Sequence, residues 1–232
     1  MHIISNNKAI KRKTRIGQIT TLAGLGVLAV GFVLSLNTEN INLSFAALIL
    51  GFVLTQIAIY HGNRWGKSPR EDELLVKGLK GLGKQTTLYT FTTPVPYLVV
   101  GPMGVWIIIP YFHEGTITYN EKKGRWRQKS KNWYMRLFGQ AGLGRPDQDE
   151  INQRTKLQQY FRKNLPENLQ PEVNVALVFT AKNVKVEAAD APIPTFALDK
   201  VKSYLRAIPK DGPADPEIMA AVKELFPKES IS

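Results

Sequence analysis

Several residue types are rare or missing in this 232-residue chain, and each absence excludes a class of chemistry. There is no cysteine, so disulfides and cysteine-based zinc sites are excluded. Only three histidines occur, His2, His61 and His113, too few and too scattered to predict a zinc site or a Ser-His-Asp triad. Acidic residues are also scarce, because 19 Asp and Glu stand against 31 Lys and Arg, for a net charge of +12.

Charge is absent from two long stretches near the N-terminus. No Asp, Glu, Lys or Arg lies between Arg15 and Glu39, or between Glu39 and Arg64. A helix needs about 20 apolar residues to cross the hydrocarbon core of a membrane. The polar turn Asn37–Asn42 separates the two stretches, which predicts a two-helix transmembrane hairpin. The expected spans are residues 16–36 and 43–61.

A signal peptide followed by a core helix is the alternative interpretation of these stretches. The first apolar run is long for a signal peptide, no Ala-x-Ala-like cleavage site follows it, and a second apolar run comes at once. These three observations favour the hairpin.

Positive charge flanks the predicted hairpin. The cations before the first span are Lys8, Lys11, Arg12, Lys13 and Arg15, and those after the second are Arg64, Lys67 and Arg70. Cationic flanks stay on the cytoplasmic side of a membrane. We therefore expect a basic cytoplasmic N-terminus (residues 1–15), a hairpin (16–61) and a cytoplasmic domain (62–232).

Small residues recur at helical spacing within both apolar runs. They are Gly17, Gly24 and Gly31 in the first, and Ala47, Gly51, Thr55 and Ala58 in the second. Small side chains let helices approach closely in lipid. We expect the two helices to pack on each other, and a homodimer through the same faces is the alternative.

The rest of the chain predicts an α/β layered domain. Ser68-Pro-Arg-Glu71 is a capping box that opens a helix, and Gly78–Gly83 ends it. Two continuous apolar runs predict strands that are buried on both faces, Tyr97–Gly101 and Gly104–Pro110. The other expected strands are Thr86–Thr93, Thr116–Asn120, a short one around Arg125–Gln128, and Val173–Thr180. The other expected helices are Asp149–Asn164, Asp199–Ala207 and one from Asp215 to just before Pro227.

Five segments, in the right order, resemble the nuclease-related domain (NERD) family, which has the restriction-endonuclease-like PD-(D/E)xK fold. They are Leu98–Trp106, Gly115–Trp126, Arg145-Pro-Asp-Gln148, Val175–Thr180 and Ala191-Pro-Ile-Pro194. The resemblance extends over residues 71–208. It implies an α/β/α domain of the restriction-endonuclease-like fold after the hairpin.

The resemblance also implies where a metal-binding motif would stand. In the family an aspartate precedes the second strand and Glu-x-Lys closes the third, so that carboxylates hold Mg²⁺ and the lysine helps to position water. The corresponding residues are Pro96, Ile109 and Tyr111, none of which has a carboxylate or an amine. Glu73, on the first helix, is the candidate remnant of an acid that many family members carry there. The resemblance therefore implies a catalytically inactive domain without a cofactor.

A migrated metal site is the alternative, and it would make the chain a Mg²⁺-dependent nuclease. His113 and Glu114 follow the third strand, and Glu73 is the other candidate acid. Mg²⁺ requires several oxygen ligands in octahedral geometry. Such a site needs at least two acids, and Glu114 and Glu73 are the only candidates, so a polar turn is the favoured interpretation of His113 and Glu114.

Positive charge is concentrated in residues 121–136, which contain seven Lys and Arg against one Glu. The predicted binding residues are Lys122, Lys123, Arg125, Trp126, Arg127, Lys129 and Lys131, followed by Trp133, Tyr134 and Arg136. Interleaved cations and rings suit nucleic acid, where rings stack on unpaired bases, or an anionic lipid surface. A solvated hairpin whose Trp126 packs on the core is the third interpretation.

The sequence thus predicts an anchored binding or scaffolding module in a prokaryotic cytoplasmic membrane. Its expected partner is nucleic acid, an anionic lipid surface or another protein. The alternative function is a metal-dependent nuclease with a residual or migrated site.

Overall fold

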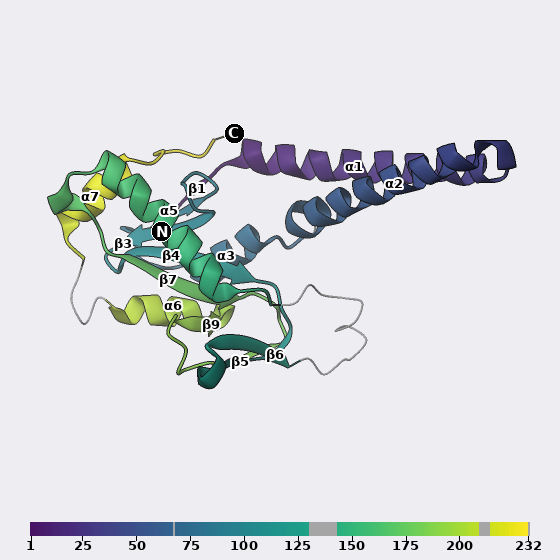
Figure 1. The fold of residues 1–232 in the computed structure, drawn as a ribbon. Helices are drawn as coiled ribbons and strands as arrows, with labels where there is room; N and C mark the ends of the chain where they lie inside the picture. Colours follow the sequence, from purple (N-terminus) through teal and green to yellow (C-terminus); the bar gives the residue numbers. More distant parts are fainter. Residues whose placement is uncertain (67, 130–142, 209–213, 232) are drawn as a thin grey trace. The chain divides into compact units, whose positions relative to one another are not determined.

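The computed structural model of the chain describes residues 1–66, 68–129, 143–208 and 214–231, which form two compact units (Figure 1). One unit is a helical hairpin, residues 7–70. The other is a sheet domain, built from residues 1–6 and 71–231. The α/β class and the two apolar helices agree with the sequence prediction. The first six residues differ from it, because they belong to the sheet domain rather than to a separate N-terminal segment.

Two long antiparallel helices form the hairpin. They are α1 (Asn7–Ser35) and α2 (Ile41–His61), joined by the short 3-10 helix η1 (Thr38–Asn40). A single-turn π-helix, η2 (Gly62–Gly66), follows α2. Both long helices are long and apolar enough to cross a membrane. The first begins nine residues before the predicted span, because the preceding Lys, Arg and Ala residues are good helix formers.

Small residues line the contact between the two helices. The buried small residues are Gly17, Gly24 and Gly31 on α1, and Ser44, Gly51 and Ala58 on α2. The Ser44 hydroxyl donates a 2.8 Å hydrogen bond to the Gly31 carbonyl. A Cβ atom added to Gly51 would lie 2.6 Å from the Leu28 side chain, so this close approach requires glycine. The predicted contact therefore forms within one chain, and a homodimer through the same faces would require the hairpin to open.

The outer surface of the hairpin is apolar. All but four of the large apolar side chains that are exposed in the described residues lie on it, and the exceptions are Ile3, Phe112, Ile151 and Ile231. A core helix of a soluble protein would be mostly buried, whereas both of these helices are mostly exposed. This surface agrees with a lipid-facing hairpin.

A six-stranded mixed sheet forms the centre of the domain. Its strands are β1 (His2–Ser5), β2 (Thr87–Thr90), β3 (Tyr97–Gly101), β4 (Gly104–Tyr111), β7 (Val173–Phe179) and β9 (Thr195–Ala197), in the order β1-β2-β3-β4-β7-β9. Strand β3 is antiparallel to both neighbours, whereas the pairs β1–β2, β4–β7 and β7–β9 are parallel. The short strand β9 was not predicted from the sequence.

Helices cover both faces of this sheet. Helices α3 (Glu71–Leu79) and α6 (Leu198–Ala207) contribute to one apolar cluster, and α5 (Pro146–Asn164) and α7 (Pro216–Glu224) to the other. Figure 1 shows α5 and α6 on opposite sides of the strands. Successive residues of β3 alternate between the clusters, since Leu98 belongs to the α5 side and Val99 to the α6 side. The strand is therefore buried on both faces, as the continuous apolar run predicts, and the layers are α/β/α.

The turn between β3 and β4 requires glycine at both ends. Gly104 has φ +93°, in the left-handed region. A Cβ atom on Gly101 would lie 2.8 Å from the Thr86 hydroxyl oxygen and 2.9 Å from the Met103 sulfur. The turn that joins the two central strands therefore has no room for a side chain at Gly101 and requires a left-handed backbone at Gly104.

The N-terminal strand β1 stands at the edge of the sheet, where Ile4 pairs with Tyr89. The C-terminal segment borders this strand, because the Ile231 amide donates to the Ser5 carbonyl at 2.9 Å and the Ser5 amide donates to the Ser230 hydroxyl at 3.0 Å. Ile4 is buried with the α5-side cluster, which explains why so short a segment joins the domain.

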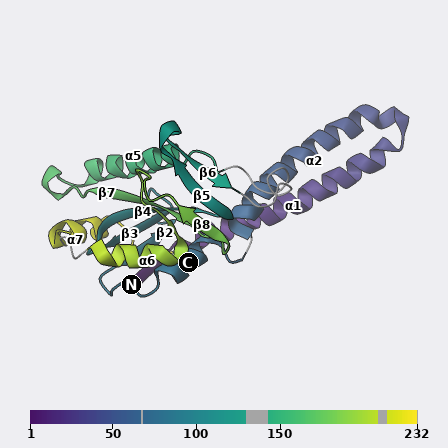
Figure 2. The same cartoon turned by 90° about the horizontal axis from the view of Figure 1, so that it is seen from below.

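A second, three-stranded sheet is attached to the same core. Its strands are β5 (Gly115–Asn120), β6 (Arg125–Lys129) and β8 (Val184–Glu187), in the order β6-β5-β8. Figure 2 shows these strands running together beside the larger sheet. Strands β5 and β6 are antiparallel and β8 runs parallel to β5. Strands β5 and β6 were predicted, whereas the four-residue β8 was not.

Candidate nucleic-acid interface

The three-stranded sheet has one apolar and one polar face, because its residues alternate along each strand. On the inner face Ile117 and Trp126 are buried, and Tyr119, Val184 and Val186 are partly buried against the α5-side cluster. The Gln128 side chain, also on this face, donates a 2.8 Å hydrogen bond to the Glu114 carbonyl. The inner face therefore holds the small sheet on the domain and leaves the outer face for solvent.

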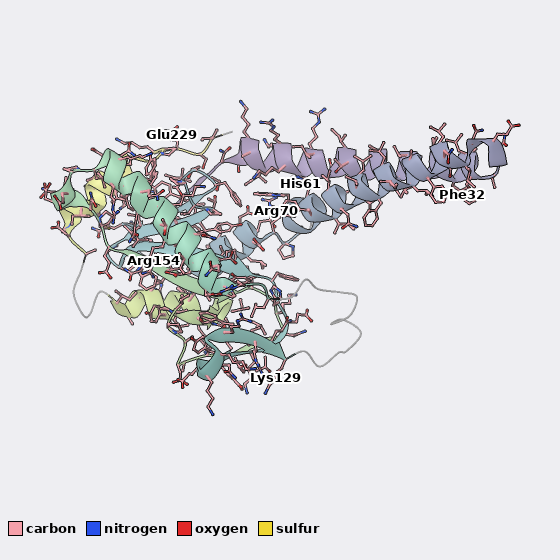
Figure 3. The ribbon with its side chains drawn as sticks, viewed as in Figure 1. Phe32, His61, Arg70, Lys129, Arg154 and Glu229 are labelled. Carbon is pink, nitrogen blue, oxygen red and sulfur yellow. The ribbon has the colours of Figure 1, made fainter. Side chains whose placement is uncertain are left out.

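The outer face carries most of the predicted cations. Arg125, Arg127 and Lys129 on β6 are exposed. Their partners on β5 are Asn120, Thr118 and Thr116 respectively, which lie on the same face. Strand β8 adds exposed Lys185, which pairs with Thr116, and exposed Glu187, which pairs with Thr118. We call these eight residues the basic sheet face; Lys129 is labelled in Figure 3.

Two further cations lie at one end of this face. Lys122 and Lys123 are exposed in the 3-10 helix η3 (Glu121–Lys123), which connects β5 to β6. The Asn120 side chain accepts a 3.0 Å hydrogen bond from the Lys123 amide, and Gly124 adopts the left-handed conformation that ends the turn. The turn therefore fixes the backbone under both lysines.

The acid on the basic sheet face is neutralised by its neighbours. Lys185 Nζ lies 2.6 Å from a carboxylate oxygen of Glu187. The hydrogen bond from Lys185, its charge and the charge of Lys129 hold the pKa of Glu187 below its ordinary value. The same pair raises the pKa of Lys185. Lys185 and the Glu187 carboxylate are therefore both charged at neutral pH, and the single acid leaves the face with an excess of cations.

Trp126 contributes to the core and not to the basic sheet face. Its side chain is 7% exposed, its indole N–H donates a 3.2 Å hydrogen bond to the Thr195 hydroxyl, and its ring lies 4.8 Å from the ring of Tyr119. A buried ring is not available to stack on a base or to enter a lipid interface. Lys131, Trp133, Tyr134 and Arg136 fall in residues 130–142, outside the described part of the chain, as does Lys67.

Sequence reasoning missed Lys185 and the Thr and Asn residues of β5. The strict alternation in Val184-Lys-Val-Glu187 is a period-two signal for a half-buried strand. Four residues are too few to make that signal decisive, and nothing local indicates that β8 pairs with β5.

The three residues that the resemblance aligns with a metal-binding motif lie at one end of the central strands. Pro96 immediately precedes β3, and its carbonyl accepts a 2.8 Å hydrogen bond from the Phe91 amide. Ile109, in β4, is 4% exposed and belongs to the α5-side cluster. Tyr111 is the last residue of β4 and its ring stacks on Phe179 of the neighbouring β7, with 5.5 Å between centroids. The structure thus uses two of these positions for apolar packing.

The Tyr111 hydroxyl is engaged by an acid from another element. It donates a 2.6 Å hydrogen bond to a carboxylate oxygen of Asp149, in the first turn of α5. Burial, with smaller contributions from the Asp149 hydrogen bond and from the charges of Asp149 and Asp147, raises the pKa of Tyr111 far above its ordinary value. Tyr111 is therefore a neutral donor that joins the end of β4 to the start of α5.

The remaining candidate acids do not converge. Glu73 lies in the first turn of α3, partly buried, and Glu114 lies between β4 and β5, where its backbone carbonyl accepts from Gln128. His113 is near the Tyr111 ring, with 6.0 Å between centroids. Within the described ranges, no group of three or more His, Asp or Glu side chains is placed to hold a metal ion.

The basic sheet face is thus the largest concentration of predicted binding residues that the described structure brings together, and the residues proposed for metal chemistry stay apart. Comparison of the chain with protein-family models, with curated proteins and with solved structures finds no match.

Proposed function

We propose that this protein is a membrane-anchored, non-catalytic module that binds duplex nucleic acid through its phosphates. The observation that carries the proposal is the composition of the basic sheet face. Its Arg, Lys, Thr and Asn side chains are the groups that contact phosphate and sugar in protein–DNA complexes. They lie on one exposed surface, supported from beneath by the buried Trp126.

The character of the face favours a duplex over the other partners. Single-strand binders present aromatic rings on which bases stack, and surface binding to lipid usually combines cations with interfacial aromatic or apolar side chains. Among its described residues the basic sheet face has neither, since Trp126 is buried. Protein interfaces of lasting affinity also depend on apolar and aromatic anchors. A surface of cations, hydroxyls and amides matches a regular array of phosphates best.

The proposed absence of catalysis rests on the motif positions. We infer that the domain is a degenerate member of the NERD family; in support, the helices and strands predicted within residues 71–208 form in the predicted order, with β8 and β9 in addition. Ile109 packs in the core and Tyr111 donates to Asp149. Neither Ile109 nor Tyr111 itself has the carboxylate or the amine that the family's chemistry requires at its position. No described feature favours the alternative of a migrated metal site.

The proposed topology places the whole domain on one side of a membrane. Strand β1 precedes the hairpin, strand β2 follows it, and the two pair in one sheet. Two spans are the number that returns the chain to its starting side. Because five cations lie at the start of α1, we propose that this side is the cytoplasm and that the cell is prokaryotic.

The test is a salt titration of the full chain, purified in a neutral detergent, with labelled duplex and single-stranded DNA of one length. A fragment that begins after the hairpin is unsuitable because it would lack β1. We expect the logarithm of the binding constant for duplex to fall linearly with the logarithm of salt concentration. Each neutralised phosphate of B-DNA contributes a slope near −0.9, so contacts to about five phosphates give a slope of about −4 to −5. We expect weaker binding of the single strand.

Charge reversal locates the surface. The variant Arg125→Glu, Arg127→Glu, Lys129→Glu should abolish duplex binding. The control reverses three exposed lysines elsewhere, Lys156, Lys200 and Lys228, with the same change in net charge, and should bind. Equal losses of duplex affinity in the two variants would mean that net charge, and not the basic sheet face, determines binding. Absence of duplex binding by the wild-type chain at low salt, or Mg²⁺-dependent cleavage of the DNA, would overturn the proposal.

A further inference from the structure

The first turns of α1 carry a second concentration of positive charge, separate in the sequence from the basic sheet face. Lys8, Lys11, Arg12, Lys13 and Arg15 are all exposed, and α1 contains no acid. Because a helix turns by about 100° per residue, four of these residues share one face. Lys8, Lys11, Arg12 and Arg15 fall within a sector of about 100°, and we call them the α1 cationic stripe.

The α1 cationic stripe points away from the partner helix. Gly17, Gly24 and Gly31, which contact α2, lie on the opposite side of α1 from Lys8. Figure 3 shows side chains with nitrogen tips on the side of the first turns of α1 that faces away from α2. The stripe is therefore on the outer, lateral surface of the hairpin, where lipid would surround it.

Lys13 has a different environment. Its Nζ lies 4.7 Å from the centre of the Trp65 ring, which is 4% exposed. The neighbouring Thr14 hydroxyl donates a 3.0 Å hydrogen bond to the Trp65 carbonyl. Lys13 thus takes part in the contact between α1 and η2 and lies about 100° or more around the helix from each residue of the stripe.

Helix length sets the depth of the stripe. Residues 16–35 of α1 are 20 residues, about 30 Å of helix, which matches the hydrocarbon core of a bilayer. The stripe then begins at the edge of that core and extends over about 10 Å, through the headgroup layer, which is about 5–8 Å deep on each side.

We propose that the α1 cationic stripe binds the phosphate groups of anionic phospholipids at the surface of the membrane. The inference rests on the membrane insertion that forms part of the proposed function, but not on nucleic-acid binding. Four cations on a lipid-facing surface at headgroup depth, without an acid on the helix, form a surface of complementary charge for anionic headgroups. Lys13, directed at Trp65, is excluded from the lipid contact.

The test compares two adjacent residues of equal charge. The full chain carries a donor dye on an introduced Asn7→Cys, which is unique because the chain has no cysteine. It is reconstituted into vesicles of phosphatidylcholine with phosphatidylglycerol, containing a trace of acceptor-labelled phosphatidylglycerol or, separately, acceptor-labelled phosphatidylcholine. Energy transfer to the two acceptors measures which lipid is enriched near α1.

We expect several-fold enrichment of phosphatidylglycerol around the wild-type chain. Arg12→Gln should reduce it, Lys13→Gln should leave it unchanged, and replacement of the whole stripe by Gln should bring the two acceptors to parity. High salt should lower the enrichment, because exposed charges are screened. Equal effects of Arg12→Gln and Lys13→Gln, or parity in the wild type, would overturn the proposal.

Flotation with pure phosphatidylcholine vesicles separates this result from failure of the anchor. A wild-type chain that floats after a carbonate wash, yet shows no lipid preference, contradicts the stripe alone. A chain that does not float contradicts membrane insertion, and with it both the anchor and this inference.

Discussion

The hydroxyl of Thr90 donates a 2.6 Å hydrogen bond to the hydroxyl of Ser5, although the whole apolar hairpin lies between these residues in the sequence. Ser5 ends β1 and Thr90 ends β2, so the bond is one of several contacts that attach the N-terminal strand to the domain. The hairpin is therefore an insertion within a folded domain and not an appendage in front of it.

Removal of the Ile4 side chain should destabilise the domain. Ile4 is 7% exposed and packs in the α5-side cluster, whereas its neighbour Ile3 is 41% exposed. Ile4→Ala should lower the free energy of unfolding by about 2–3 kcal/mol, as expected for a buried isoleucine. Ile3→Ala, the matched control, should change it by less than about 0.5 kcal/mol. Chemical denaturation of the full chain in detergent measures both, and similar losses would contradict the burial of β1.

Single cysteines should reveal the topology of the hairpin. The native chain contains none, so no background labelling occurs. Glu39→Cys, in the exposed turn between α1 and α2, should react with an impermeant maleimide only from the side opposite the domain. Lys8→Cys and Lys200→Cys should both react only from the domain side. Reaction of Lys8→Cys and Lys200→Cys from different sides would be incompatible with the pairing of β1 and β2.

Enlarging a contact glycine should separate the two helices. A leucine at Gly51 would collide with Leu28, whereas no atom lies within 4 Å of a Cβ added to Gly26. Gly51→Leu should therefore destabilise the hairpin by about 1–3 kcal/mol through overpacking, and Gly26→Leu should not. Titration with sodium dodecyl sulfate, followed by circular dichroism, measures the midpoint. Equal midpoints would show that the helices do not pack through this face.

The Tyr111→Phe variant should lose stability in a manner that depends on pH. Loss of the hydrogen bond to Asp149 should cost about 1–2 kcal/mol near neutral pH, since the acceptor is charged. Burial raises the pKa of Tyr111 in the folded state, while the unfolded chain titrates at about 10. Above that pH the Tyr111 phenol loses its proton in the unfolded wild-type chain, which stabilises the unfolded state. The difference in free energy of unfolding between the wild type and Tyr111→Phe should therefore shrink.

Denaturation at about pH 8 and at about pH 11 checks this, because only the higher value exceeds the unfolded pKa. Tyr119→Phe is a control that removes a less buried phenol hydroxyl. An advantage of the wild type that is constant across both pH values would mean that the Tyr111 phenol is not held neutral by the fold.

The parts of the fold that were predictable have strong local signals. The two apolar helices follow from the absence of charge, and β3 and β4 from continuous apolar runs bounded by Gly101 and Gly104. Strand β1 was not predictable, because His2–Ser5 is four residues long and its partner lies beyond the hairpin. The sequence predicted one part of the basic sheet face, the cations of β6, because residues 121–136 are rich in Lys and Arg. It did not predict Lys185, which joins this face only because β8 pairs with β5. The orientation of Trp126 depended on strand register, since a shift of one residue would have exposed it.

The hydrogen bond from Thr14 to the Trp65 carbonyl has a consequence for the order in which the chain folds. Pairing β1 with β2 requires the closure of a long loop, and the entropy lost grows with the length of flexible chain that must be closed. Because α1 and α2 pack together, residues 14 and 65 are neighbours once the hairpin has formed. Most of the intervening chain is then already ordered. Insertion into the membrane would thus turn a distant strand pairing into a nearly local one, and the edge of the sheet should form after the hairpin and not before it.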